Sequence, residues 1–533
     1  KISNRNMCIM FLLVNVVVCC IVTISPNEAA RILAVFPVPS ISHQVVFRTL
    51  TQELAKRGHD MTVITTDPVP EKADTPPKLT EIDVHDISYD IWKQIFMTAP
   101  KGQTNNVVAQ TKIMIYAFAK IVDAQLKTEE VKSLISNKKK HFDLLMIEAC
   151  VRPALVFSHI YKNVPVIMVG SLGALPGNYE VIGAPVHPIL YPIVFHHRIH
   201  NLTFWEKVTE VYNHYQLNNV YDEIAEVKNS ILQKHFGPDT PSVEELSNNV
   251  DMLFLNVNPI FEGIRPVPPS VVYMGGLHLK PPKELPTEIK SYLDSSKHGV
   301  IYISFGTNVV PSSLPPERIA ILTKVFSELP YDVLWKWDKD ELPGRSENIK
   351  ISKWLPQPDI LGHPKLKVFI TQGGLQSTDE AIVAGVPLIG FPMLGDQWFN
   401  LEKYVYFKIG IKLDIETVTE EQFMNKQVLR KYLNLNFVLS YRQNIKKLRS
   451  LMLDTPQQPL ERAVWWTEHV LRHGGAKHLR SPAANISWAR YLELELVLTL
   501  LAGPLAIAVI VLIALYALYK HFAFAKKLKN VVK

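Results

Sequence analysis

Short, almost uninterrupted apolar runs alternate with amphipathic segments along the first half of the chain. Residues 31–38 predict a strand, 45–56 a helix that ends before Gly58, and 60–66 a second strand. The same unit recurs, with a strand at 142–149, a helix at 154–162 and strands at 165–170 and 250–257. Nearly continuous apolar strands separated by helices are typical of a parallel sheet covered on both faces.

Proline becomes dense between residues 258 and 297, and the alternation then starts again. The second half predicts strands at 300–307, 331–337, 367–371 and 386–392, with helices at 316–329, 374–384 and over 397–475. We therefore expect an α/β protein made of two doubly wound domains, 31–257 and 298–455, joined by a linker at 258–297. In such folds ligands bind in the cleft at the carboxyl ends of the strands.

Both ends of the sequence read as membrane-targeting segments. An apolar run at 9–24 follows a basic residue and precedes small residues, which predicts a signal peptide over 1–30; an uncleaved anchor is the alternative. Residues 496–519 form an uncharged stretch long enough to cross a bilayer. Five lysines lie in the tail, 520–533, so the positive-inside rule predicts a single-pass type I protein with a cytosolic tail.

Charge and cysteine content narrow the function classes. The chain has 57 basic and 50 acidic side chains, but the excess lies at its two ends and residues 31–519 are nearly neutral. Nucleic acid is therefore not the default partner. Cys150 alone remains after the signal segment, so no intramolecular disulfide and no Cys/His zinc cluster is expected. Two sequons, at Asn201 and Asn485, would accept glycans in a lumen.

The most informative polar pattern follows Trp354. A strand runs into Gly373-Gly374 and then a helix, a junction where backbone N–H groups and the helix dipole favour a phosphate. Glu380, two turns into that helix, is placed for the hydroxyls of a ribose, and Trp354 offers a flat face to a base. Asp396 and Gln397, after the next strand, can bind sugar hydroxyls. Each feature alone is weak, whereas together and in this order they are specific.

This stretch resembles the signature of the UDP-glycosyltransferases, and the resemblance covers nearly the whole chain. The wording TQGGLQSTDEAI is most similar to insect members, lepidopteran ones in particular. The resemblance implies a GT-B fold of two Rossmann-like domains facing a cleft, with C-terminal helices at 456–495 packing back toward the first domain. It also implies donor contacts from Trp354 and Gln357 to uracil, from Thr307, Gln372, Gly374 and Ser377 to the diphosphate, from Glu380 to ribose, and from Asp396 and Gln397 to the sugar.

One position departs from the family pattern. Most members have histidine where Gln372 stands. A glutamine amide can donate a hydrogen bond to the diphosphate but never carries charge. We interpret Gln372 as a lineage variant, because the insect wording carries it too; loss of activity is the alternative.

The resemblance also implies a catalytic base. The family places a histidine in a short element after the first strand, which here is Ser42-His43. An acceptor hydroxyl must lose its proton during attack, and imidazole suits that task. The acid that orients this histidine aligns with Glu148, where the family has aspartate, and Asp143 is the fallback.

The implied reaction is an inverting transfer of glucose from UDP-glucose, the donor co-substrate, to small lipophilic acceptors such as phenolics, xenobiotics, pigments or hormones. No metal is expected, since the acidic pair Asp338 and Asp340 lies in a charged turn. Glucose is favoured over glucuronate because the sequence around Asp396 holds no cation. The irregular segments at 70–140 and 175–245 are candidates for the acceptor surface.

Three functional readings remain open from sequence. The leading one is a detoxifying enzyme at the endoplasmic reticulum membrane, with its catalytic domains in the lumen. The second is a catalytically silent, UDP-sugar-binding member that acts as a regulatory partner of other transferases, motivated by Gln372 and Glu148. The third, a nucleotide-sugar epimerase, is disfavoured because such enzymes have little use for a signal and an anchor. Homo- and hetero-oligomers are both compatible with the sequence.

Overall fold

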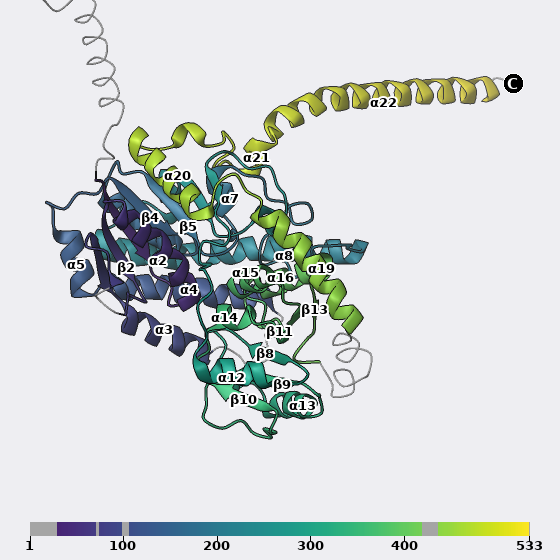
Figure 1. Cartoon of the computed structure of the whole chain (residues 1–533). Helices are drawn as coiled ribbons and strands as arrows, with labels where there is room; N and C mark the ends of the chain where they lie inside the picture. Colours follow the sequence, from purple (N-terminus) through teal and green to yellow (C-terminus); the bar gives the residue numbers. More distant parts are fainter. Residues whose placement is uncertain (1–28, 71–73, 99–105, 418–434, 532–533) are drawn as a thin grey trace, which may run out of the picture.

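The computed structural model describes residues 29–70, 74–98, 106–417 and 435–531 (Figure 1). Most of the segment expected as a signal peptide therefore lies outside the described residues. The described chain contains two all-parallel sheets, one from each half of the sequence. Helices flank both sheets, and one long helix, α22, leaves the body at the C-terminus.

The first sheet has seven strands in the order β3-β2-β1-β4-β5-β6-β7. The order reverses between β1 and β4, the switch point where doubly wound sheets bind ligands. Along β1, Ile32, Ala34 and Phe36 face one buried cluster while Leu33 and Val35 face another, so both faces are covered. The strands are β1 (Arg31–Phe36), β2 (Asp60–Thr65), β3 (Leu79–Asp83), β4 (Leu144–Glu148), β5 (Val166–Gly170), β6 (Val250–Leu255) and β7 (Val271–Tyr273).

Helices on the two faces of this sheet bury the side chains that the strands present. The helix α2 (Ile41–Lys56) contributes Val46, Phe47 and Leu50 to the cluster on one face, and α4 (Val107–Gln125) contributes Phe118 and Val122 on the other. The remaining helices of this domain are α3 (His85–Thr98), α5 (Glu129–Ser136), α6 (Phe157–Ile160), α7 (Asn178–Ile182), α8 (Phe204–Glu223), α9 (Ala225–Phe236), α10 (Val243–Leu246) and α11 (Pro259–Glu262).

The second sheet has six strands in the order β10-β9-β8-β11-β12-β13, again with a reversal beside its first strand. The strands are β8 (Val300–Ser304), β9 (Asp332–Lys336), β10 (Ile349–Ser352), β11 (Leu366–Thr371), β12 (Leu388–Gly390) and β13 (Gly410–Lys412). Its helices are α12 (Thr287–Ser295), α13 (Pro316–Ser327), α14 (Gln357–Leu361), α15 (Leu375–Ala384) and α16 (Gln397–Tyr406).

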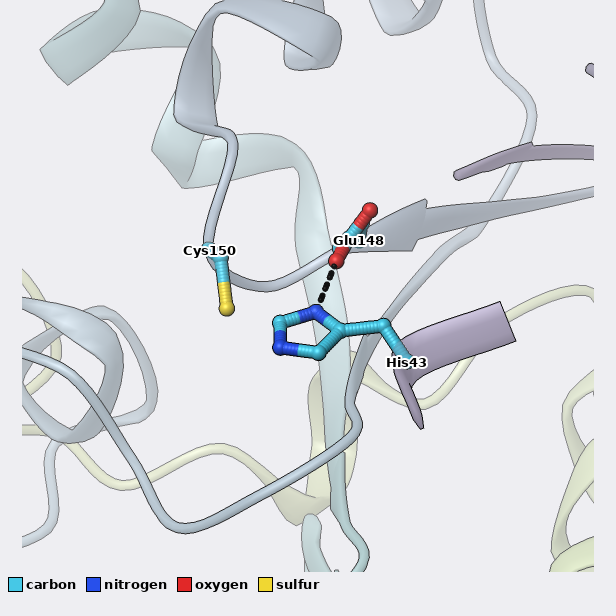
Figure 2. Close-up of side chains that lie close together, drawn as sticks. All are labelled: His43, Glu148 and Cys150. Atoms are coloured by element: carbon cyan, nitrogen blue, oxygen red, sulfur yellow. Dashed lines mark hydrogen bonds and ion pairs between the residues drawn. The ribbon is translucent and has the colours of Figure 1, made fainter. Parts of the chain in front are cut away.

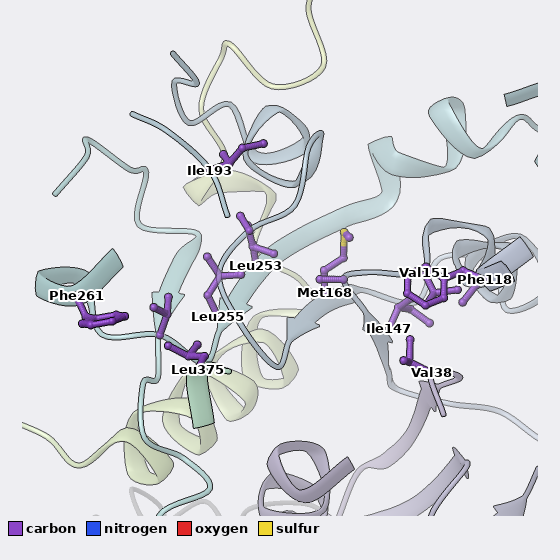
Figure 3. Packing of buried hydrophobic residues seen from close by; sticks show 14 of the residues in the cluster. Val38, Phe118, Ile147, Val151, Met168, Ile193, Leu253, Leu255, Phe261 and Leu375 are labelled. Atoms are coloured by element: carbon purple, nitrogen blue, oxygen red, sulfur yellow. The ribbon is translucent and has the colours of Figure 1, made fainter. Parts of the chain in front are cut away.

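The two domains share buried apolar contacts. One cluster runs from Ile147 and Met168 in the first sheet through Leu255 to Leu375, the first residue of α15 (Figure 3). Polar contacts join the loops as well, since Gln376 donates to the backbone oxygen of Ser171 over 2.9 Å. The carboxyl ends of both sheets therefore meet where the donor and acceptor sites are expected.

The linker between the domains is shorter than the range 258–297 that the sequence predicts. That range contains β7, which pairs with β6 and completes the first sheet. It also contains α12, whose Tyr292 hydroxyl donates to Val333 in the second sheet. The connection between the domains is thus confined to the residues between Tyr273 and Thr287. A three-residue strand among prolines gives no periodic signal, which is why it was missed.

The C-terminal segment returns to the first domain. After α19 (Leu435–Leu453), the helix α20 (Pro459–His473) places Ala463, Val464 and Val470 in the same cluster as α2. The helix α21 (Trp488–Tyr491) then leads into α22 (Leu494–Val531). Within the described part of the chain, one helical stretch, Leu494–Ala525, is long and apolar enough to cross a membrane, and none of it is buried.

Candidate active site

The first feature of the site is an imidazole–carboxylate pair at the switch point of the first sheet. His43 lies in the first turn of α2, directly after β1, and Glu148 is the last residue of the neighbouring strand β4. Their side chains point toward one another, with 2.8 Å between His43 Nδ1 and Glu148 Oε1 (Figure 2). The other carboxylate oxygen accepts from the backbone N–H of Val38 over 3.1 Å.

The burial of Glu148 affects the protonation of this pair. Glu148 is fully buried, which raises the pKa of its carboxyl, while the hydrogen bonds from His43 and Val38 lower that pKa. An ionised Glu148 accepts the proton on Nδ1 and thereby fixes the tautomer in which Nε2 is the free basic nitrogen. The arrangement can therefore take a proton at Nε2 and stabilise the resulting imidazolium.

Asp143, the fallback partner, is wrong for this role. It lies just before β4, at the opposite end of the strand from Glu148. Its carboxylate pairs with Arg31, with 3.0 Å between the guanidinium and Oδ1, and also accepts from the Arg31 backbone. The Arg31 guanidinium helps to hold the pKa of Asp143 below its usual range.

Cys150 is a neighbour of the pair that sequence reasoning did not find. The polar atoms of His43, Glu148 and Cys150 all lie within 4.8 Å of one another. Burial, with the charge of Glu148, raises the pKa of the thiol well above its ordinary value, so the group is neutral. In the sequence, its position two residues after Glu148, near the end of a predicted strand, indicated that Cys150 lies near the pair.

The second feature is the glycine-lined junction of the other domain. Gly373 has a φ of +90°, and an added Cβ there would lie 2.0 Å from Leu401 Cδ1. Gln372 is buried, and Thr371 Oγ1 donates to its Oε1 over 3.1 Å. Its Nε2 lies near two glycines, 2.2 Å from where a Cβ of Gly306 would be and 3.2 Å from one of Gly374. Only glycines leave room for this amide beside the N-terminus of α15.

Three predicted donor residues form one hydrogen-bonded group. Gln357 Nε2 donates to Ser377 Oγ over 2.9 Å and to Glu380 Oε2 over 2.7 Å. The hydroxyl of Tyr302 donates to the Gln357 carbonyl over 3.2 Å, which fixes the amide orientation. Burial raises the pKa of Glu380 to about 7.

Lys336 supplies a cation that the sequence account lacked. It ends β9, and its Nζ lies 4.6 Å from the centre of the Trp354 ring, which is 63% exposed. The same ammonium donates to the backbone oxygen of Gly306 over 3.0 Å. Its position at the carboxyl end of a strand, beside the predicted base-stacking residue, was the available signal.

Asp396 and Gln397 lie at the start of α16. Asp396 is partly buried, and its burial raises the pKa of its carboxyl, while the hydrogen bond from Asn400 over 2.7 Å and the charge of His43 lower that pKa. Gln397 Oε1 accepts from the backbone of Met393 and Leu394, at 2.7 and 2.8 Å. The carbonyl of Gln397 therefore shapes the loop, and its amide nitrogen is the group left for a ligand.

Comparison with known proteins decides the family. A family model described as UDP-glucoronosyl and UDP-glucosyl transferase matches residues 31–530. The chain belongs to the UDP-glycosyltransferase family. It is 34% identical over 495 residues to the ecdysteroid UDP-glucosyltransferase of Spodoptera littoralis nuclear polyhedrosis virus, covering 89% of this chain and 94% of that protein. It is 31% identical over 515 residues to UDP-glucosyltransferase 2 of Dactylopius coccus, covering 96% and 98%.

Solved structures confirm the GT-B fold of this UDP-glycosyltransferase. A UDP-glucose:anthocyanidin 3-O-glucosyltransferase in complex with UDP matches with a TM-score of 0.56 at 17% identity, over 84% of this chain and 100% of that one. The glycosyltransferase VinC in complex with dTDP also matches with a TM-score of 0.56, at 14% identity, over 83% and 100%. The sequence-based expectations of family and fold are both confirmed.

The remaining predicted positions of this transferase lie at its surface. Thr307 is exposed in the turn after β8, next to Asn308, whose amide donates to Ser40 Oγ across the domain boundary over 3.1 Å. Both sequon asparagines, Asn201 and Asn485, are exposed and have positive φ angles. The acidic pair that suggested a metal motif is engaged elsewhere: Asp338 accepts from Ser312 and Asp340 pairs with Lys353.

Proposed function

We propose that this UDP-glycosyltransferase transfers glucose from UDP-glucose to a hydroxyl group of small lipophilic acceptors, with His43 as general base and inversion at the anomeric carbon. The observation that carries the proposal is the buried His43–Glu148 pair at the carboxyl end of the first sheet, across from the donor residues of the second. Such a base–orienter pair contributes about 10²–10⁴-fold to a proton-transfer reaction.

The reaction is a direct displacement. The acceptor hydroxyl gives its proton to His43 Nε2 as its oxygen forms the bond to the anomeric carbon, and Glu148 stabilises the imidazolium. The bond between that carbon and the β-phosphate oxygen breaks on the opposite face, so an α-linked donor gives a β-linked product. The Lys336 ammonium binds the donor diphosphate, and the Gln372 amide and the N-terminus of α15 stabilise the diphosphate as it leaves.

The residues around the expected sugar site favour glucose over glucuronate as the transferred sugar. A glucuronate carboxylate needs a cation near Asp396, and the nearest lysine of the same helix, Lys403, is buried, which lowers its pKa to about 8 although the charge of Glu262 raises it. The relatives compared above are named as glucosyltransferases. Trp354 with Gln357 takes the uracil, Thr307, Gly374 and Ser377 contact the diphosphate, Glu380 binds the ribose, and Asp396 with Gln397 binds the sugar. No metal takes part.

The acceptor side is apolar. A buried cluster of Val107, Leu175, Val194, Phe195, Ile199, Leu217 and Phe399 packs against the partly buried Val108, Met114, Cys150 and Leu172. Cys150 links this cluster to His43. Because Phe399 comes from the donor domain and the rest from the first, this cluster packs the two domains together beside the base. Ecdysteroids, named for several relatives, are lipophilic acceptors of this class.

We propose that the enzyme is a single-pass type I protein of the endoplasmic reticulum. The exposed apolar stretch Leu494–Ala525 supports an anchor, and Trp488 and Tyr491 precede it as aromatic residues do at membrane interfaces. The lysines beyond it support a cytosolic tail. Luminal catalytic domains would carry glycans at Asn201 and Asn485, and an anchored site meets lipophilic xenobiotics where they partition.

The test uses microsomes that contain the full chain, with labelled UDP-glucose and a panel of phenols and an ecdysteroid. We expect a glucoside from the wild type, its loss in His43→Ala, and its retention in the matched control His141→Ala, an exposed histidine outside the site. Turnover that survives His43→Ala would refute the base. UDP-glucose binding without turnover would instead support the silent regulatory partner that Gln372 motivates.

A further inference from the structure

Three histidines gather where α20 ends, far along the chain from the catalytic base. His469 and His473 are one turn apart on α20, and His478 lies in the short 3₁₀ helix Lys477–Leu479 that follows. The ring centres are 4.5 Å apart for His469 and His473, 5.8 Å for His469 and His478, and 6.3 Å for His473 and His478. We refer to these three residues as the histidine cluster.

The histidine cluster borders a polar cavity of about 980 Å³. His473 and His478 line the cavity together with Pro165, Asp239, Glu245 and Asp251. Pro165 precedes β5 and Asp251 lies at the start of β6, so the cavity opens at the amino ends of these strands. The catalytic pair lies at the carboxyl ends, which makes the two sites separate.

We propose that the histidine cluster binds a divalent transition-metal ion of the Zn²⁺ class, with water from the cavity as the fourth ligand. Neutral imidazole is a preferred ligand of such ions. With Zn–N bonds of about 2.0–2.1 Å and tetrahedral angles, ring centres on one ion are roughly 5 Å apart. The three observed separations bracket that value. The ring nitrogens are not all within 4.8 Å of one another in this structure, so binding requires His473 and His478 to rotate toward a common ion.

The surroundings of the histidine cluster favour binding in two ways. His469 Nε2 is buried and has no hydrogen-bond partner among the described atoms, a deficit that a metal bond would remove. His473 and His478 are exposed and free to turn.

The backbone that carries the histidine cluster is already fixed. Asp251 accepts from the backbone N–H of Ala476 over 2.9 Å and from that of Val166 over 3.0 Å, which ties the turn to the first sheet. Gly474 and Gly475 adopt positive φ angles of 64° and 133°, which allow the chain to reverse between His473 and His478. The bound ion would therefore clip the end of α20 to the following turn.

The sequence predicts no Cys/His zinc cluster because one cysteine remains after the signal segment. That argument does not apply to a site made of histidines alone. A site of this kind is also distinct from the reaction, which the proposed mechanism runs without a metal. Its role would be to stabilise the C-terminal segment against the first domain.

The test measures Zn²⁺ binding by the full chain in detergent, carrying no polyhistidine tag, by competition with a chromogenic chelator. We expect one saturable site whose affinity falls roughly tenfold or more in His473→Ala and in His478→Ala. The control His159→Ala removes another histidine of the same cavity wall and should leave affinity unchanged. A second control, His43→Ala, tests whether Zn²⁺ binds instead at the group of His43, Glu148 and Cys150. It should also leave the Zn²⁺ affinity unchanged.

A second measurement distinguishes loss of a ligand from poor folding of a variant. Cu²⁺ bound in place of Zn²⁺ should show coupling to three nitrogens in its electron paramagnetic resonance spectrum, and to two in His478→Gln. Absence of saturable binding, equal affinity in all variants, or loss of the site in His43→Ala would overturn the proposal.

Discussion

Glu148 bridges two structural elements with its two carboxylate oxygens: one accepts from His43 at the start of α2 and the other from the backbone of Val38 just before it. The carboxylate thus holds both the imidazole ring of the proposed base and the loop that positions it. Since Glu148 is fully buried, any replacement that cannot accept at both points leaves buried donors unpaired.

The first prediction concerns this carboxylate. In Glu148→Gln the amide keeps the shape but stabilises the wrong tautomer and no longer the imidazolium, so kcat should fall roughly 10²–10⁴-fold. The KM for UDP-glucose should change little, because the donor is bound by the other domain. Steady-state kinetics with a phenol acceptor measure both constants. The conservative Glu148→Asp should retain more activity, and equal losses in both variants would argue against the orienting role.

The second prediction concerns pH. The pKa of Glu380 is raised to about 7, and its ionised form accepts from the ribose hydroxyls, so donor binding should strengthen as pH rises through 7 and weaken as it falls. Between pH 8 and pH 6 the Kd for UDP-glucose should rise roughly tenfold. Calorimetry on His43→Ala avoids turnover. The dependence should disappear in the added variant Glu380→Gln; a profile unchanged by that substitution would place the titrating group elsewhere.

The third prediction concerns Lys336. Its ammonium lies over Trp354 and donates to Gly306, so Lys336→Met should raise the KM for UDP-glucose by roughly tenfold or more, the effect of one hydrogen bond to a charged group. Lys336→Arg keeps the charge and should lose less. Lys339→Met, on the exposed turn nearby, is the matched control and should behave as wild type. A loss confined to kcat would contradict a binding role.

The fourth prediction compares the glycines that flank α15, Gly373 before it and Gly385 after it. Leu401 fills the space between Gly373 and Gly390, and added Cβ atoms there would lie 2.0 and 2.5 Å from its methyl carbons. Gly373→Ala should therefore cost about 1–3 kcal/mol of overpacking on top of about 1–2 kcal/mol of left-handed strain.

Gly385→Ala is the control for that comparison, because Gly385 has a φ of +74° with nothing within 4 Å of an added Cβ. It should show the strain alone. Thermal unfolding of the two variants in detergent measures the difference, and equal midpoints would mean that Leu401 yields without cost.

Sequence reasoning succeeded where a local pattern fixes position. The strand-to-helix junctions after β1 and β11 are marked by apolar runs followed by His43 and by Gly373, so these parts of the site were predicted in place. These junctions are features that secondary-structure periodicity dictates directly. Glu148, which ends the strand beside β1, was instead assigned from the family resemblance.

What was missed depends on tertiary neighbours. Lys336 is one lysine among many until β9 brings it beside Trp354, and Cys150 gains meaning only from its closeness to His43. Asp143 and Glu148 belong to the same strand segment, and only the pairing of Arg31 with Asp143 shows which acid is free for catalysis. β7 is too short to carry a pattern and exists because β6 offers an edge.

The return of α20 to the first domain decides which half of the enzyme is fixed in space. The helix packs against α2 and Arg57 pairs with Glu461, so the chain reaches α22 from the acceptor domain. Under the proposed anchoring, the acceptor domain is therefore the half of the chain that is attached directly to the membrane segment. The donor domain is joined by the connection between Tyr273 and Thr287 and by the stretch before α20, so it is linked to α22 only by way of the acceptor domain.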